Sequence, residues 1–230
     1  MLKGLIFDLD GVITDSARFH LAAWNELARQ LGIELPPEAN DDLRGRSRMD
    51  SLAVILNYGG QVGRYSEEEL AAFAAQKNAA YTKLIAGMTE ADVLPGIHRL
   101  LDDAKTSGLT MAIASASRNA PVILNQLRLT DYFTATVDPN DLQHGKPDPE
   151  IFVRAQKLLG LQTDEVISFE DASAGVQAIK AAGQYAVGIG DVHVLAAADY
   201  NVPDTGALVL SKIKVAFDTQ TQTKEEMSHG

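Results

Sequence analysis

Short apolar and β-branched runs recur along the chain and predict the strands of a sheet. The predicted strands span residues 3–9, 110–115, 165–169 and 185–190, and a weaker run spans 207–210. Segments with a helical spacing of apolar residues separate them. Strands that alternate with helices are typical of a parallel sheet with right-handed crossovers and helices on both faces. We therefore expect an α/β protein with a Rossmann-like parallel sheet as its core.

Capping residues and glycines mark the ends of the helices between these strands. The predicted helices run from Ile97 to Gly108, from Asp148 to Gly160 and from Ser173 to Gly183. Asp148 can cap the second helix, with a proline at its first position, and a glycine ends each helix. From about Asp218 the chain is polar, and we expect a frayed tail there.

Residues 15–90 interrupt the alternation, because they show helical patterns only. These patterns span residues 16–31, 48–57 and 66–86, and the last begins with a capping box from Ser66 to Glu69. The segment follows the first predicted strand and precedes all the others. It is therefore an insertion into the sheet domain.

The insertion divides the chain into two predicted domains. They are an α/β core of residues 1–14 and 93–230 and a helical cap, or lid, of residues 15–92. Linkers near residues 12–16 and 87–95 would connect them; the second contains Gly87 and Pro95 and is followed by Gly96. A lid that hinges at two such points is a common device for closing a site.

Composition and charge limit the compartments and partners that fit the chain. With 230 residues, 46% of them hydrophobic, it can bury a substantial core, and it has no cysteine for a disulfide or a thiolate metal site. Its net charge of −11 disfavours nucleic acid and anionic membranes as partners, because both bind basic surfaces. No segment resembles a signal peptide or a membrane span. We expect a cytoplasmic monomer that acts on small molecules.

The first predicted strand ends in two aspartates. In L-I-F-D-L-D-G, residues 5–11, Asp8 and Asp10 are two positions apart, so an extended chain directs both side chains to one side. Two carboxylates about 4 Å apart repel by about 4 kcal/mol at an effective dielectric constant of about 20. Protonation, a bound cation or divergence into solvent would relieve the repulsion. For an isolated pair, a solvated strand end is the simplest interpretation.

A second acidic pair follows another predicted strand. Glu170 and Asp171 come directly after residues 165–169, at the carboxyl end where ligands bind in parallel sheets. On their own they fit a helix cap as well as a ligand site. Together with Asp8 and Asp10 they form a set of oxygen donors that favours a hard cation, Mg²⁺ before Zn²⁺.

Groups suited to a phosphate follow the predicted strand at 110–115. Ser115, Ser117 and Asn119 offer hydroxyl, amide and backbone donors where a helix begins, although an ordinary helix cap uses the same residue types. Lys146 lies in a loop before another helix, where a lysine is usually solvated. Four carboxylates and a phosphate nevertheless require a cation, which favours a functional role for Lys146.

The insertion carries basic residues in unusual places. Lys77 lies on the apolar stripe of its predicted helix, where it either snorkels to solvent or points into a cleft. Arg44, Arg46 and Arg48 surround a glycine in a loop that fits either a phosphate site or a solvated basic turn. A lone histidine such as His20 is most often a surface residue.

Several motifs together narrow the family. The chain has no Walker A motif, no G-x-G-x-x-G and no zinc-ligand spacing, which argues against a nucleotide-binding Rossmann enzyme. In chain order, D-L-D-G-V-I-T-D, A-S-A-S, K-P-D-P and E-D resemble the motifs of the haloacid dehalogenase-like phosphohydrolase superfamily. The segments R-G-R-S-R-M-D-S-L, S-A-S-R-N and F-E-D-A-S-A-G-V-Q-A-I-K-A-A-G, with the pair K-N, further resemble its sugar-phosphate mutases. The resemblance covers nearly the whole chain except about the last dozen residues.

This resemblance implies roles for the acidic residues and for a larger binding set. Asp8 would be the nucleophile that forms an aspartyl-phosphate, and Asp10 the general acid/base. Mg²⁺ would be held by Asp8, Asp171 and the main-chain carbonyl of Asp10, with support from Glu170. The implied phosphoryl- and substrate-binding residues are His20, Gly45, Arg48, Ser51, Lys77, Ser115, Ala116, Ser117, Asn119 and Lys146.

The activity implied by the resemblance is an isomerisation of β-glucose 1-phosphate and glucose 6-phosphate through a 1,6-bisphosphate. The alternative is a magnesium-dependent sugar-phosphate phosphatase of the same superfamily, in which water accepts the phosphoryl group from Asp8. Arg46 and residues 57–65 depart from the pattern of the mutases and bear on sugar selectivity. A receiver-like phospho-acceptor module is the third hypothesis, but such a module has no use for a helical lid.

Overall fold

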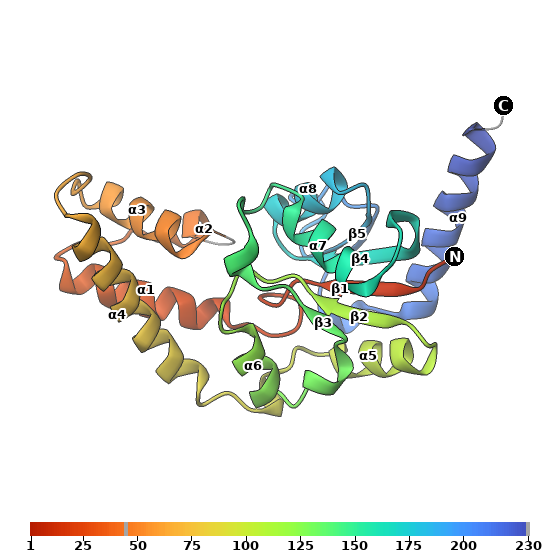
Figure 1. The fold of residues 1–230 in the computed structure, drawn as a ribbon, viewed down its shortest axis with the longest axis horizontal. Helices are drawn as coiled ribbons and strands as arrows, with labels where there is room; N and C mark the ends of the chain where they lie inside the picture. The colour runs from red at the N-terminus through yellow and green to blue at the C-terminus, as the bar shows by residue number, and fades with distance from the viewer. Residues whose placement is uncertain (44–45, 229–230) are drawn as a thin grey trace. The chain divides into compact units, whose positions relative to one another are not determined.

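The computed structural model of the chain describes residues 1–43 and 46–228. Two compact units are present, one of Met1–Asp15 and Glu90–Gly230 and one of Ser16–Thr89 (Figure 1). We call them the core unit and the cap unit. The cap unit is helical and is inserted after the first strand of the core unit, which fits a cap.

The core unit is built on a parallel sheet. Its strands are β1 Gly4–Phe7, β2 Thr110–Ile113, β3 Ala135–Thr136, β4 Val166–Glu170, β5 Tyr185–Ile189 and β6 Tyr200–Val202. They lie in the order β3-β2-β1-β4-β5-β6, and every neighbouring pair is parallel. The predicted α/β class with a Rossmann-like parallel sheet is confirmed.

The first strand occupies the centre of the sheet. Phe7, its last residue, pairs with Ile113 of β2 on one side and with Phe169 of β4 on the other. All of β1 is buried, and the Phe7 and Phe169 rings stack with their centroids 4.6 Å apart. Strands covered on both faces are continuous apolar runs of this kind. The residues that follow β1, β2 and β4 consequently emerge at one edge of the sheet.

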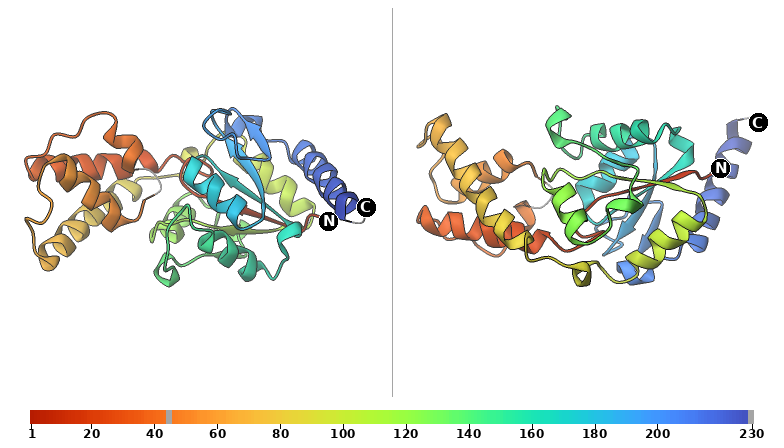
Figure 2. Two further views of the ribbon diagram at one scale, coloured as in Figure 1. Left: turned by 90° about the horizontal axis from the view of Figure 1, so that it is seen from above. Right: turned by 60° about the horizontal axis from the view of Figure 1, so that its bottom comes forward.

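Helices cover both faces of the sheet. They are α5 Ile97–Thr106, α6 Ala120–Gln126, α7 Glu150–Leu159, α8 Ser173–Ala181 and α9 Leu210–Ser228, with 3₁₀ turns at Glu90–Asp92, Thr130–Tyr132, Pro139–Asp141, Thr163–Glu165 and Thr205–Ala207. α7 and α8 lie on one face, and α5 and α6 lie on the other (Figure 1). Ile6, Phe152 and Ile179 belong to the apolar core beneath α7 and α8. The N-terminus and α9 lie together at one end of the core unit in both views of Figure 2.

The cap unit has a hydrophobic core of its own. Its helices are α1 Ala17–Gln30, α2 Ala39–Leu43, α3 Arg48–Tyr58 and α4 Glu67–Ile85. Trp24 and Leu27 of α1 pack with Leu52 and Ile55 of α3. The predicted capping box at the start of α4 is confirmed, because Ser66 and Glu69 each accept the other's backbone N–H. Among the described helices, none is long and apolar enough to cross a membrane.

The two segments through which the chain leaves and re-enters the core unit are paired. The backbone N–H of Leu94 donates to the Ile13 carbonyl at 2.9 Å, and Thr14 Oγ1 donates to the Asp92 carbonyl at 2.7 Å. Thr14 is fully buried. These bonds hold the two ends of the insertion side by side within the core unit.

Two predictions about the C-terminal part of the chain were wrong. The apolar run at 207–210 is not a strand, because it joins a 3₁₀ turn to the first residue of α9. The polar tail expected from Asp218 is helical as far as Ser228. Helix α9 is anchored by Ile213 and Phe217, which are buried four residues apart on one face.

Two strands were not predicted from the sequence, and one helix start was placed a residue too early. β3 and β6 are short edge strands with partly exposed residues, and they lack the apolar runs that reveal the central strands. Helix α7 begins at Glu150, one residue later than expected. The Asp148 carboxylate still accepts a hydrogen bond of 2.9 Å from the Glu150 backbone N–H.

Candidate active site

Acidic residues from two neighbouring strands meet at the carboxyl edge of the sheet. Asp8 follows β1, and its backbone N–H donates to the Phe169 carbonyl at 3.0 Å, which continues the pairing of β1 with β4. Glu170 ends β4. The side chains of Asp8 and Glu170 are both buried. The convergence expected from parallel strands is therefore present within the core unit.

Lys146 joins these two carboxylates. Its Nζ lies 2.5 Å from Asp8 Oδ1 and 2.7 Å from Glu170 Oε2, and its side chain is only 6% exposed. The ammonium also lies 5.0 Å from the ring centroid of Phe152. A buried charge is tolerable only where it is paired and hydrogen-bonded, and both conditions hold here. Lys146 is thus a balancing cation rather than a solvated loop lysine.

Three carboxylates of the core unit are grouped closely enough to hold a metal ion. Asp8, Glu170 and Asp171 each offer one oxygen, and these oxygens lie within 4.8 Å of one another. Glu170 also accepts a hydrogen bond of 3.1 Å from the Ala172 backbone N–H. A donor set made only of carboxylate oxygens fits a hard divalent cation such as Mg²⁺.

Burial and charge repulsion shift the pKa values of the ionisable side chains at this edge. Burial, with the nearby Asp8 and Asp171 charges, raises the pKa of Asp10 from 3.8 to about 8. Burial also raises the pKa of Glu170 to about 8, although Lys146 opposes the shift. Despite the cost of burial, the Asp8 and Glu170 carboxylates raise the pKa of Lys146 and keep it charged. Such crowding of like charges is what a bound cation relieves.

Two glycines give the carboxylates their space. A Cβ at Gly11 would lie 1.9 Å from Asp171 Oδ2, and the positive φ of 82° at this residue further favours glycine. A Cβ at Gly175 in α8 would lie 2.0 Å from Glu170 Cδ. Any larger residue at either position would displace a carboxylate of the cluster.

The loop after β2 offers hydroxyl groups at the same edge. Ser115 lies two residues after the end of β2 and is buried, and its Oγ accepts a bond of 3.1 Å from the Ser117 backbone N–H. Ser117 Oγ in turn accepts a bond of 3.3 Å from the Asn119 backbone N–H. Ala116 lies exposed between the two serines. Because each hydroxyl that accepts a bond can still donate its hydrogen, the loop suits phosphate oxygens.

In the cap unit, Lys77 is enclosed by aromatic rings. The residue is 3% exposed, and its Nζ lies 4.6 Å from the Trp24 ring centroid and 4.9 Å from that of Tyr81. It donates a hydrogen bond of 2.6 Å to His20 Nδ1. Cation–π contacts and this bond replace water around the ammonium. Snorkelling to solvent, one of the two predicted alternatives for Lys77, does not occur.

His20 is held as a neutral acceptor. Its ring stacks on Tyr81 with centroids 3.8 Å apart. Burial, with the charges of Lys77 and Arg48, lowers the pKa of His20 to about 3. The imidazole is therefore part of a packed cluster, whereas a lone histidine was expected to be a surface residue.

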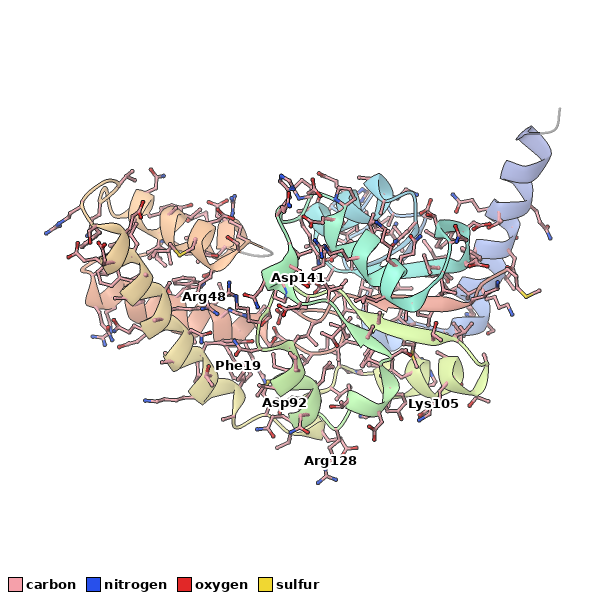
Figure 3. All side chains as sticks on the ribbon, in the orientation of Figure 1. Phe19, Arg48, Asp92, Lys105, Arg128 and Asp141 are labelled. Atoms are coloured by element: carbon pink, nitrogen blue, oxygen red, sulfur yellow. The ribbon has the colours of Figure 1, made fainter. Side chains whose placement is uncertain are left out.

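The other predicted residues of the cap unit lie around the start of α3. Arg48 is its first residue (Figure 3), and its Nη2 donates a bond of 2.8 Å to Asn78 Oδ1 of α4. Ser51 is buried, and its hydroxyl donates to the Ser47 carbonyl at 3.0 Å. Gly45 lies outside the described residues.

Two residues of these clusters had no role assigned from the sequence. Asn78 directly follows Lys77 in the chain, and a polar residue beside a buried lysine is a weak signal of a shared site. Gly175 is a glycine in the first turn of a helix, where its helix-weakening effect calls for a packing reason. The close approach of Glu170 supplies that reason.

Comparison with known proteins places the chain in a family. The model of haloacid dehalogenase-like hydrolases matches residues 2–183, which include the whole cap unit and most of the core unit. The chain belongs to the haloacid dehalogenase-like hydrolases. The α/β core with an inserted helical cap and the acidic cluster at the carboxyl edge are thus features of a haloacid dehalogenase-like protein.

Individual relatives of this haloacid dehalogenase-like protein include mutases and a phosphatase. It is 44% identical to the β-phosphoglucomutase of Bacillus subtilis over 91% of this chain and 92% of that protein. It is 32% identical to the fructose-1-phosphate phosphatase YqaB of Escherichia coli over 84% of this chain and 97% of that protein. The crystal structure of β-phosphoglucomutase from Clostridium difficile matches with a TM-score of 0.94 and 40% identity, over 96% of this chain and 99% of that one.

The role of Gly175 can be tested by adding a single methyl group. We expect Gly175→Ala to lower kcat for phosphoryl transfer about 10- to 100-fold, because the new Cβ would push Glu170 away from Lys146. Alanine favours a helix over glycine, so the change should not weaken α8 by itself. Steady-state kinetics would measure the loss. Ala181→Ser, at an exposed position of α8, is the matched control; equal activity of the two variants would contradict the expected displacement.

Proposed function

We propose that this chain is a β-phosphoglucomutase that interconverts β-glucose 1-phosphate and glucose 6-phosphate through a 1,6-bisphosphate. The observation that carries the proposal is the 44% identity to a β-phosphoglucomutase over 91% of the chain. The match also covers 92% of that mutase. A mutase and a phosphatase can share the edge chemistry, but the identity to this mutase is 44%, against 32% to the fructose-1-phosphate phosphatase, which favours the mutase.

Asp8 is the proposed nucleophile. Its carboxylate lies 2.5 Å from the Lys146 ammonium, which can also neutralise oxygens of a phosphoryl group attached to Asp8. Ser115 would donate its hydroxyl to the same group. Covalent transfer to Asp8 divides one difficult displacement into two easier steps.

Asp10 is the proposed general acid/base. When a sugar hydroxyl attacks the phosphoryl group on Asp8, Asp10 accepts the proton of that hydroxyl and the bisphosphate forms. When the other phosphate of the bisphosphate moves to Asp8, Asp10 returns the proton to the departing sugar oxygen. The raised pKa of Asp10 allows both directions near neutral pH, because each protonation state is accessible there.

A magnesium ion is the proposed cofactor. Asp8 and Asp171 would hold it together with the main-chain carbonyl of Asp10, and Glu170 would support the site. The grouping of buried carboxylate oxygens fits this ion. When bound, it would neutralise negative charge at the phosphoryl group.

We assign the second phosphate of the bisphosphate to basic and amide groups. Arg48, Ser117 and Asn119 are the proposed ligands, because a guanidinium and N–H or O–H donors match phosphate oxygens. Asn78 accepts a bond from Arg48 and would hold its guanidinium in one orientation. His20 and Lys77 would position Asp10, as the resemblance to the sugar-phosphate mutases implies. As a cytoplasmic monomer, the enzyme would need only small sugar phosphates as partners.

The partition between mutase and phosphatase activity tests the proposal. The purified protein with MgCl₂ would receive β-glucose 1-phosphate and a trace of glucose 1,6-bisphosphate, and glucose 6-phosphate and free phosphate would be measured together. We expect glucose 6-phosphate as the main product. Free phosphate as the main product would support the phosphatase, and a parallel assay with fructose 1-phosphate would then identify its substrate.

A further inference from the structure

The position of the Lys146 ammonium requires a rigid loop. A lysine side chain has several rotatable bonds, and fixing it costs up to about 2 kcal/mol of conformational entropy. Lys146 nevertheless places its Nζ within 2.7 Å of two buried carboxylates. The residue lies in the loop between the 3₁₀ turn Pro139–Asp141 and helix α7. Something must hold this loop in place.

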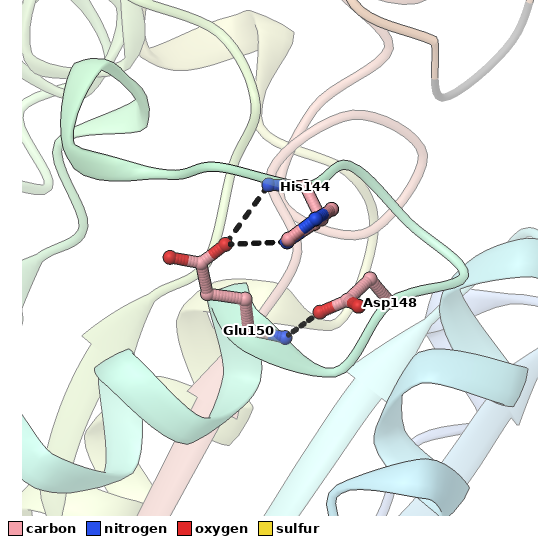
Figure 4. Close-up of side chains that lie close together, drawn as sticks. All are labelled: His144, Asp148 and Glu150. Atoms are coloured by element: carbon pink, nitrogen blue, oxygen red, sulfur yellow. Dashed lines mark hydrogen bonds and ion pairs between the residues drawn. The ribbon is translucent and has the colours of Figure 1, made fainter.

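Glu150, the first residue of α7, binds the start of that loop (Figure 4). Its Oε2 accepts hydrogen bonds from the backbone N–H groups of Gln143, at 2.8 Å, and His144, at 2.9 Å. Its Oε1 accepts bonds of 3.0 Å from Arg154 one turn along the helix. One carboxylate thus ties the segment that precedes Lys146 to the helix that follows it.

Asp148 closes the other half of the loop. Its backbone N–H donates to the Gly145 carbonyl at 3.0 Å, and its Oδ1 accepts from the Glu150 backbone N–H at 2.9 Å (Figure 4). Lys146 therefore lies between two fixed points. A shift of either point would carry the Lys146 backbone with it.

The same side chains could be mistaken for a metal site. His144, Asp148 and Glu150 each place a ligand atom within 4.8 Å of the others. However, the Glu150 oxygens and Asp148 Oδ1 already accept hydrogen bonds from the loop and from Arg154. The backbone bonds to His144 and Gln143 lower the pKa of Glu150, as expected of a carboxylate that serves as an acceptor. These contacts fit carboxylates that hold the loop in place rather than carboxylates that bind a metal ion.

We propose that Glu150 is a positioning residue that acts on phosphoryl transfer through Lys146. This inference rests on the proposed role of Lys146 at the phosphoryl group, and it holds for a mutase and a phosphatase alike. Glu150 itself touches neither Asp8 nor Glu170 among its described contacts. Its effect must therefore disappear when Lys146 is absent.

Kinetic variants can separate this role from simple stabilisation. We expect Glu150→Ala to lower kcat about 10- to 100-fold with little change in KM, because a displaced ammonium stabilises the transition state less. Glu150→Gln keeps an acceptor oxygen for the two N–H groups and should restore most of the activity. Arg154→Ala, which removes only the contact on Glu150 Oε1, is the matched control. Its kcat and KM should stay close to those of the parent chain.

A double-mutant cycle with Lys146→Ala provides the decisive readout. Affinity for beryllium fluoride with MgCl₂, measured by calorimetry, reports the phosphoryl site without turnover, and hydrolysis of p-nitrophenyl phosphate reports transfer without a sugar. In the parent chain, Glu150→Ala should lower both the affinity for beryllium fluoride and the rate of p-nitrophenyl phosphate hydrolysis. In the Lys146→Ala background, Glu150→Ala should change each of these two quantities by no more than about 2-fold. An equal loss in the two backgrounds would overturn the inference. If the cycle gives the expected result but the assay detects no mutase activity, only the proposed sugar chemistry is refuted.

Discussion

Replacing Asp8 with asparagine is expected to lower turnover by about 1,000-fold or more, because the amide cannot attack phosphorus. The change removes one negative charge from a cluster that holds Glu170 and Asp171 within 4.8 Å. Repulsion from the other carboxylates falls, but the ion pair of 2.5 Å with Lys146 is also lost, so a thermal unfolding curve must show that the variant is folded at the assay temperature. The loss of activity in a folded variant would then reflect the missing nucleophile and not unfolding. Turnover of β-glucose 1-phosphate with bisphosphate and MgCl₂ would measure it, beside a thermal unfolding curve.

The matched control is Asp103→Asn, which makes the same change at an exposed position of α5. It should leave turnover within about 2-fold of the parent chain, because exposed charges far from a site contribute little. Activity of Asp8→Asn within 10-fold of the parent would contradict both the mutase and the phosphatase, since both transfer the phosphoryl group to Asp8. Such a result would mean that a residue other than Asp8 is the nucleophile.

The sheet and its acidic edge were predictable because both follow from short-range patterns. Buried parallel strands are continuous apolar runs, and β1 and β4 stood out for that reason. Parallel pairing then forces the residues after Phe7 and Phe169 to one edge. Balance of charge was enough to single out Lys146. By contrast, β3 and β6 are edge strands too short to show a period.

The surroundings of Lys77 could not be predicted in this way. Its aromatic neighbour Trp24 and its acceptor His20 belong to α1, more than 50 positions earlier in the chain. Only the packing of α1 against α4 brings them together. A stripe position was compatible with snorkelling, and the sequence contains nothing local that decides between solvent and an aromatic enclosure. For the same reason, the bond between Arg48 and Asn78 was not foreseen.

Asp10→Asn is expected to lower mutase turnover about 100- to 10,000-fold, since the sugar hydroxyl loses its proton acceptor and the sugar oxygen its donor. The loss should depend on the leaving group. p-Nitrophenolate departs without a proton, so transfer from p-nitrophenyl phosphate to Asp8 should fall far less than transfer from the bisphosphate. Rapid-quench measurement of the first turnover with each donor would compare them. Equal losses with both donors would assign Asp10 a role other than proton transfer.

The same variant should change how stability depends on pH in the metal-free protein. Asp10 has a pKa raised from 3.8 to about 8, so between these values the folded chain keeps a proton that the unfolded chain has lost. The contribution of Asp10 to the free energy of unfolding must then decrease as pH rises from about 4 to 8. Glu170 contributes a slope of the same sign, because its pKa is also raised to about 8. Asp10→Asn removes only the first contribution, so thermal midpoints measured in EDTA should fall less steeply with pH than those of the parent chain and of Asp103→Asn. Parallel curves for all three proteins would contradict the raised pKa of Asp10 in the folded, metal-free chain.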